Sequence, residues 1–354
     1  MRRLLSAIVA VLAVGTAQAQ SNWAKVPVPV YNPTHFVQGV YRHWALPQAL
    51  EFSARSAALT SSVQALCDAP AADAAQRLEA ARLGWRASVL SWDGLSAVAI
   101  GPLIERRSQR QIDFTPTRPA LIAKAIAAAP ADEVAMERVG TPAKGLPALE
   151  WLLWEQPLPP GSAACAYAVQ VAADVAREAT ALSTAFQQAA DRDWSDEPAA
   201  VAAMSEIVNQ WIGGIERLRW AQLEKPLKSA AAQRPIYARA ESDSSAASWS
   251  AQWQSLRRLS VFSADAVPTP GAALVPLETF LRGKGRNTVA DALVGSSRHV
   301  DASFKTLQAA ARRPPTAAHV QAASTQLGAL KRVAESDLAP ALQVSIGFSD
   351  ADGD

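Results

Sequence analysis

The sequence predicts an all-α protein divided into two helical bundles. Alanine is abundant and alternating runs of β-branched residues are nearly absent, a composition that favours helix over sheet. Apolar residues recur with the period of an α-helix over several long segments. Clusters of proline and glycine separate these segments into two groups, and each group is long enough to bury a core.

One apolar stripe illustrates the helical pattern. Leu78, Trp85 and Trp92 are spaced seven residues apart, which places their side chains on one face of a helix. Trp151 and Trp154 also have the spacing of core residues, so we interpret these tryptophans as core packing rather than as stacking platforms for a ligand. Similar stripes predict further helices over residues 46–66, 165–186, 201–223, 249–261, 289–307 and 320–338.

Helix-breaking residues suggest the division of the chain. Gly101-Pro102 interrupts one long helical pattern, and the prolines and glycine of residues 157–161 close the first half. Near the N-terminus, residues 26–30 alternate like a strand, but Pro27 and Pro29 cannot donate to a sheet, so we expect an extended segment. The predicted parts are an extended lead-in (20–33), a first helical bundle (34–156), a second helical bundle (162–340) and a C-terminal tail (341–354).

The first 19 residues have the pattern of a cleaved signal peptide. Arg2 and Arg3 form a basic start, residues 4–14 are apolar, and Ala17-Gln18-Ala19 is a small-x-small cleavage site. The mature chain is then expected to begin near Gln20 and to be periplasmic or secreted. No later segment approaches the run of about 18 apolar residues that a membrane span needs, so we expect no transmembrane helix.

Charge argues against nucleic acid as a partner. The formal net charge is +2, and removal of Arg2 and Arg3 makes the mature chain about neutral. The short basic groups at residues 106–110, 257–258 and 312–313 are interpreted as solvated helix faces.

The chain has two cysteines, Cys67 and Cys165. Oxidising compartments favour pairing of two thiols in an exported protein, so we expect a disulfide between them. The alternative is two buried and unreactive thiols.

The four histidines limit the chemistry that the chain can perform. The paired histidines of a His-Glu-x-x-His zinc peptidase are absent. The sequence also lacks the Gly-x-Ser-x-Gly elbow of serine hydrolases, and neither cysteine lies in a Cys-x-x-Cys motif.

The informative segment is Gly145-Leu-Pro-Ala-Leu-Glu-Trp-Leu-Leu-Trp-Glu155. It resembles the hallmark of the imelysin family, the insulin-cleaving metallopeptidase-like proteins, in which Gly-x-His-x-x-Glu precedes an aromatic-Leu-Leu run. The resemblance spans nearly the whole mature chain, through matching segments at residues 67–68, 85–92, 101–102, 111–114, 215–219, 225–227 and 346–354. It implies two packed helical bundles with a cleft between them, a role in iron acquisition at the cell envelope, and peptidase activity in some members.

The chain departs from the family motif at one position. Pro147 stands where the family has histidine, whereas Gly145 and Glu150 are kept. In the intact motif, an imidazole and a carboxylate three residues apart share one helix face and can hold a cation. Glu150 alone would hold a divalent ion only weakly. A purely structural interpretation is that residues 145–147 start a helix, with Glu150 in its first turn.

Other residues could complete a ligand site. His43, which lies shortly before Pro47, resembles a histidine position of the family and is the best replacement metal ligand, although a packed histidine is the simpler interpretation. Asp113 and Arg110 could line the same cleft as Glu150, or could form an ion pair that braces the bundle. His35 is expected in the extended lead-in, and His299 and His319 on helix faces.

The leading functional hypothesis is a non-enzymatic protein that binds a ligand or partner in iron or haem uptake. Its expected partners are envelope proteins of that uptake system. Its cofactor is unidentified, with iron or another divalent metal held weakly. One alternative is a metallopeptidase that uses Glu150 with His43 and a third ligand, and another is a structural envelope protein.

Overall fold

The computed structural model describes residues 27–230, 235–263, 266–309 and 315–347, and every regular element in these ranges is helical. The predicted all-α class is therefore confirmed. The predicted signal peptide, the start of the lead-in and the end of the C-terminal tail lie outside the described residues.

The helices agree closely with the apolar stripes in the sequence. The elements are α1 (Pro33–Val40), η2 (Tyr41–Ala45), α2 (Leu46–Cys67), η3 (Ala71–Asp73), α3 (Ala74–Ser96), α4 (Pro102–Glu105), α5 (Ser108–Ile112), α6 (Pro119–Ala128), α7 (Glu133–Glu137), η4 (Thr141–Ala143), α8 (Gly145–Trp154), α9 (Ala163–Asp191), α10 (Glu197–Glu216), η5 (Arg217–Glu224), α11 (Lys225–Ser229), α12 (Ser245–Ser260), α13 (Leu277–Gly283), α14 (Asn287–Ala309), α15 (Ala317–Val333), η6 (Ala334–Leu338) and α16 (Ala339–Ala341).

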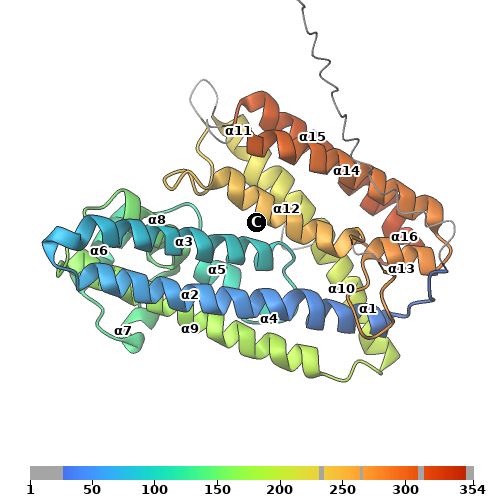
Figure 1. Cartoon of the computed structure of the whole chain (residues 1–354), viewed down its shortest axis with the longest axis horizontal. Coiled ribbons are helices and arrows are strands. Elements are labelled where there is room, and N and C mark those ends of the chain that lie inside the picture. Colours follow the sequence, from blue (N-terminus) through green and yellow to red (C-terminus); the bar gives the residue numbers. More distant parts are fainter. Residues whose placement is uncertain (1–26, 231–234, 264–265, 310–314, 348–354) are drawn as a thin grey trace, which may run out of the picture.

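The long helices form two groups that pack against each other (Figure 1). In the first group, α2 packs along α3 and α9, and α8 packs on α3 and α9. In the second group, α14 and α15 form an antiparallel pair, and α15 packs on α10 and η5. α12 joins the groups because it contacts α3 on one side and α10 and α14 on the other.

A disulfide fixes the start of α9 beside the end of α2. Cys67 and Cys165 are bonded with their Cα atoms 5.5 Å apart, which confirms the predicted pairing. The Gly161 N–H also donates to the Cys67 carbonyl over 3.1 Å. These links return the chain to α2 after the proline cluster. As a result, α9 groups in space with helices that precede residues 157–161, which the expected division places in the other bundle.

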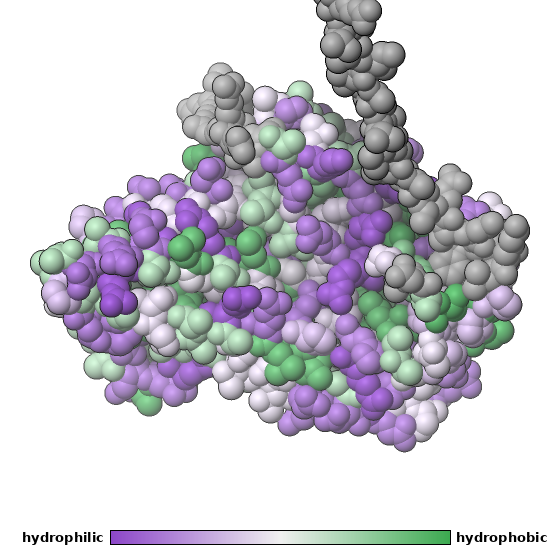
Figure 2. Space-filling model, in the orientation of Figure 1, coloured by the Kyte–Doolittle hydropathy of each residue, from purple (hydrophilic) through white to green (hydrophobic). Residues whose placement is uncertain are grey.

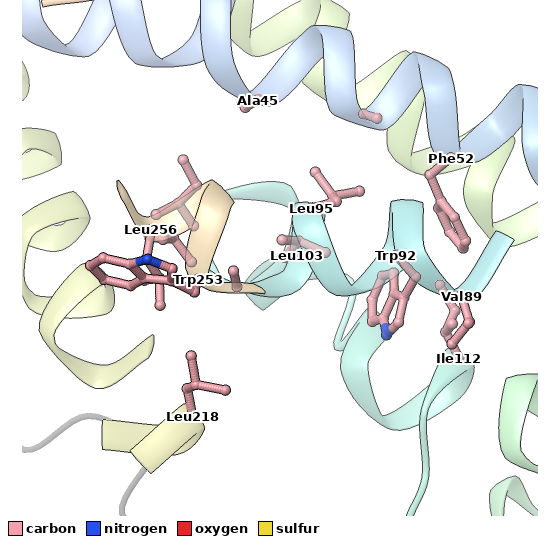
Figure 3. Close-up of a cluster of buried hydrophobic side chains, with 14 of the residues drawn as sticks. Ala45, Phe52, Val89, Trp92, Leu95, Leu103, Ile112, Leu218, Trp253 and Leu256 are labelled. Atoms are coloured by element: carbon pink, nitrogen blue, oxygen red, sulfur yellow. The ribbon is translucent and has the colours of Figure 1, made fainter. Parts of the chain in front are cut away.

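The hydrophobic core continues across both groups (Figure 3). Phe52 of α2 contacts Trp92 of α3, with ring centroids 5.2 Å apart. Leu218 of η5 and Leu256 of α12 belong to the same buried cluster. A Cβ atom on Gly214 would lie only 2.1 Å from the Ala97 carbonyl oxygen, so glycine is what allows α10 to pack this closely.

Three prolines lie inside continuous helices rather than at their ends. A π-helical segment precedes each of Pro47, Pro226 and Pro340, with one residue between the end of the segment and the proline. The residue before each proline donates its N–H to a carbonyl five residues back: Leu46 to Tyr41, Lys225 to Trp220 and Ala339 to Ala334. Since proline has no N–H and disturbs the α-helical hydrogen bonds of the preceding turn, a widened turn at this point lets the helix continue.

The surface mixes polar and apolar side chains. On the face in Figure 2, hydrophobic residues form small separate areas among hydrophilic ones. Within the described ranges, no helix is long and apolar enough to cross a membrane.

Candidate functional site

The start of α8 lies directly against the end of α5. Gly145 has φ +83°, and a Cβ atom there would lie 2.4 Å from the Ile112 carbonyl oxygen, so only glycine fits. Pro147 is buried in the first turn of the helix, where its missing N–H costs no hydrogen bond. The Trp85 indole N–H donates to the Leu146 carbonyl over 2.9 Å and holds this turn against α3.

Glu150 is buried and paired with a residue of the same chain. It lies in the second turn of α8, not in the first turn as expected, because the helix begins at Gly145. Its Oε1 atom accepts hydrogen bonds from the Ser242 backbone N–H (3.0 Å) and from the Ser242 hydroxyl (2.7 Å). The Ser242 carbonyl accepts in turn from Arg86 of α3 over 3.1 Å. Glu150 therefore fastens the segment before α12, residues 235–244, onto the first group of helices.

Arg239 of the same segment lies between two buried carboxylates. Its guanidinium forms ion pairs with Asp93 (3.2 Å) and with Asp113 (2.8 Å), and only 4% of the residue is exposed. The Trp92 indole N–H donates to Asp113 over 3.2 Å. Arg239 has φ +65°, an uncommon conformation for a residue with a side chain. The ion pairs hold it in this position.

A second guanidinium lies near these acids. Arg217 of η5 is part-buried and donates to the carbonyls of Ser96 and Ala97, the latter over 3.0 Å. Desolvation lowers the pKa of Arg217, while Asp113 and Asp93 oppose that shift. Asp93 and Asp113 therefore interact with two positive charges: Arg239 through ion pairs, and Arg217 through longer-range attraction.

Burial controls the electrostatics of the carboxylates. Burial raises the pKa of Glu150, and the hydrogen bond from the Ser242 hydroxyl and the charge of Arg239 only partly oppose this shift. Burial likewise raises the pKa of Asp93, with Arg239 acting in the opposite direction. The folded protein therefore disfavours full ionisation of this cluster.

The structure brings together only some of the site residues that the sequence suggests. Asp113 and Glu150 both interact with Arg239, so they belong to one buried cluster. Arg110, on α5, and His43, on η2, are both exposed. Among the described residues, no hydrogen bond or ion pair joins either of them to Glu150.

The remaining histidines lie outside this cluster. His35 is in the first turn of α1 rather than in an extended lead-in, because the Asn32 side chain caps the helix and accepts from the His35 N–H over 2.9 Å. His299 and His319 lie on α14 and α15, as predicted.

Sequence reasoning missed Asp93, Arg239 and Ser242. Asp93 carried a usable signal, since it is a charged residue between Trp92 and Leu95 in the apolar part of a helix, and buried carboxylates need partners. The sequence gives no such signal for Arg239 and Ser242, because they lie in an irregular polar segment with no periodicity.

The fold and the site define an all-helical protein whose buried carboxylates are paired with residues of the same chain. The family model of imelysin matches residues 45–336, and the chain belongs to the imelysin family. No curated protein is similar enough in sequence to match the chain.

Two solved structures share the fold. An imelysin-like protein from Psychrobacter arcticum 273-4 superposes with a TM-score of 0.73 at 21% identity, covering 91% of this chain and 100% of that protein. A protein described as an iron-regulated protein A precursor, from Parabacteroides distasonis ATCC 8503, gives a TM-score of 0.67 at 13% identity, covering 86% of this chain and 93% of that protein.

The residues present do not fit the metal centre that a metallopeptidase would need. Within the described part of the chain, no group of three or more His, Cys, Asp or Glu side chains could hold a metal ion. Glu150 already accepts two hydrogen bonds from Ser242, and Arg239 already neutralises Asp93 and Asp113. These internal partners compete with a divalent ion for the carboxylates.

Proposed function

We propose that this protein is an exported, non-enzymatic member of the imelysin family that binds a ligand or a partner protein in iron or haem uptake. The observation that carries the proposal is the pairing of Glu150 with Ser242. The acidic position of the family motif holds a segment of the same chain, and Pro147 supplies no ligand beside it.

The assignment to iron or haem uptake has a separate basis. The imelysin resemblance implies a role in iron acquisition, and one of the two structural neighbours is described as an iron-regulated protein. The signal-peptide pattern of residues 1–19 supports export.

Glu150 acts in this proposal as a positioning residue. Its hydrogen bonds to Ser242 hold segment 235–244, which leads into α12. Because α12 packs against both groups of helices, the position of this segment influences how the two groups meet. A partner that recognises this junction would then sense a change at Glu150 without touching its carboxylate.

The test begins with the protein purified from its native envelope without chelators. We expect elemental analysis to find far less than one transition-metal ion per chain, and no proteolysis that a chelator abolishes. One tightly bound metal ion per chain with chelator-sensitive proteolysis would instead establish the metallopeptidase alternative.

A growth experiment tests the link to iron. Cells that lack the protein should grow more slowly when iron is limited, and the wild-type chain should restore growth. Glu150→Ala should restore it only in part, whereas Glu137→Ala, a change at an exposed residue of α7, should restore it fully. Equal growth with and without the protein at every iron supply would favour the structural alternative.

A further inference from the structure

A groove separate from the Glu150 cluster lies where α2, α3 and α12 meet. Its volume is about 410 Å³, within the range of pockets that hold small molecules. Gln48 and Arg55 line it from α2, Leu90 from α3, and Ser255 and Arg258 from α12.

The floor of the groove is held by internal hydrogen bonds. The Ser255 hydroxyl donates to Gln48 Oε1 over 2.9 Å, and the Gln48 amide donates to the Trp44 carbonyl over 2.9 Å. Gly94 adds to the tight packing, because a Cβ atom there would lie 3.2 Å from Gln48 Oε1. The floor is thus preformed, and its polar side chains are already partnered.

The rim of the groove carries exposed arginine side chains that are weakly paired within the protein. Arg258 and Gln254 are exposed, and Arg258 forms no ion pair with any described residue. Among the described residues, Arg55 forms one ion pair, over 3.4 Å, with Glu51, which also lines the groove; both side chains are more than half exposed. Such an exposed pair contributes little and leaves most guanidinium N–H groups available.

The two arginines lie on opposite sides of the Gln48–Ser255 contact. α2 and α12 run in opposite directions (Figure 1), so the residues that follow this contact in the two helices lie toward opposite ends of the groove. Arg55 follows Gln48 by about two helical turns, and Arg258 follows Ser255 by about one turn. Apolar side chains, among them Leu90, contribute to the lining.

We propose that this groove binds a small organic anion with a carboxylate group at each end and an aliphatic middle. Each carboxylate would pair with one guanidinium, and the aliphatic part would lie along the apolar lining. The proposal does not depend on the function of Glu150.

Adipate and hexanoate provide a direct test, because both have six carbons but only adipate has a carboxylate at each end. Titration calorimetry at constant ionic strength should detect saturable binding of adipate, and hexanoate should bind about tenfold more weakly because one charged hydrogen-bonded contact is missing. Equal affinity for the two probes, or no saturable binding of adipate, would overturn the proposal.

Variants locate the site. Arg258→Gln and Arg55→Gln should each lower the adipate affinity by about tenfold and leave hexanoate binding much less affected. Arg77→Gln is the matched control, since Arg77 is exposed on α3 but does not line the groove. If Arg77→Gln weakens adipate binding as much as Arg258→Gln does, the anion is held by general surface charge and the assignment is wrong. Glu137→Gln, a change at an exposed residue of α7 that does not line the groove, should leave adipate binding unchanged.

Discussion

At the scale of single residues, Glu150 makes stability depend on pH. Burial raises the pKa of its carboxyl above the ordinary 4.5, so the folded state favours the protonated form more than the unfolded state does. The resulting stabilisation is complete below the ordinary pKa and is lost as the pH rises through the raised pKa.

Glu150→Gln should remove this dependence, because a glutamine does not titrate and its carbonyl oxygen still accepts from Ser242. The free energy of unfolding of the variant, relative to wild type, should therefore increase as the pH rises above 4.5. Urea unfolding over a series of pH values measures this difference. Glu137→Gln, at an exposed residue, is the control and should follow the wild-type curve. A difference that falls with rising pH would contradict the assignment.

Arg239 should be costly to remove because its two partners would remain buried. Arg239→Ala leaves Asp93 and Asp113 without their guanidinium, and breaking a buried pair in this way costs about 3–5 kcal/mol. Combining it with Asp93→Asn and Asp113→Asn removes the uncompensated charges, so the triple variant should lose less free energy of unfolding than Arg239→Ala alone. Equal losses in chemical denaturation would mean that packing, and not charge, explains the role of Arg239.

At the scale of elements, close approach of α10 to residue 97 depends on Gly214. Gly214→Ala would place a methyl group against the Ala97 carbonyl and the Leu256 side chain, and overpacking of this kind costs about 1–3 kcal/mol. Gly295→Ala is the matched change on α14, where nothing lies within 4 Å of the added Cβ. It should raise the free energy of unfolding by about 0.5–1 kcal/mol, since alanine favours helix. Thermal unfolding of both variants measures the contrast, and a shift in the same direction for both would contradict it.

The long elements could be predicted because their signal is local. The apolar stripe over residues 165–186 marks the core face of α9, and the one over residues 320–338 runs through α15 into η6 without a break. The stripe expected over residues 201–223 did not reveal the π-helical segment before Pro226, in which the buried Leu218 and Leu223 are five residues apart. Glu150 was expected in the first turn of its helix, but the helix begins at Gly145, so Glu150 lies in the second turn.

At the scale of the whole molecule, prediction succeeded for class and disulfide but was incomplete for the site. The helical class follows from composition and periodicity, and the disulfide was expected from two cysteines together with the predicted export. Neither prediction required knowledge of long-range contacts. The partners of Glu150 depend on such contacts, because Ser242 follows it by 92 residues and lies in an irregular segment. The placement of α9 beside α2 has the same origin, since only the folded chain shows that residues 157–161 return to Cys67.

The disulfide links two distant parts of the chain, and it stabilises the fold by restricting the unfolded chain. Cys67 and Cys165 are 98 residues apart, and closing a loop of that length stabilises a protein by about 4–5 kcal/mol on the chain-entropy model. Replacing both cysteines with alanine should lower the free energy of unfolding by up to that amount. It should also increase the dependence of that free energy on urea concentration, because the unfolded chain becomes less compact.

Wild-type protein treated with a reductant should behave like the double variant, and the double variant should not respond to the reductant. If the double variant keeps both the wild-type stability and the wild-type urea dependence, the link between α2 and α9 is maintained by packing alone.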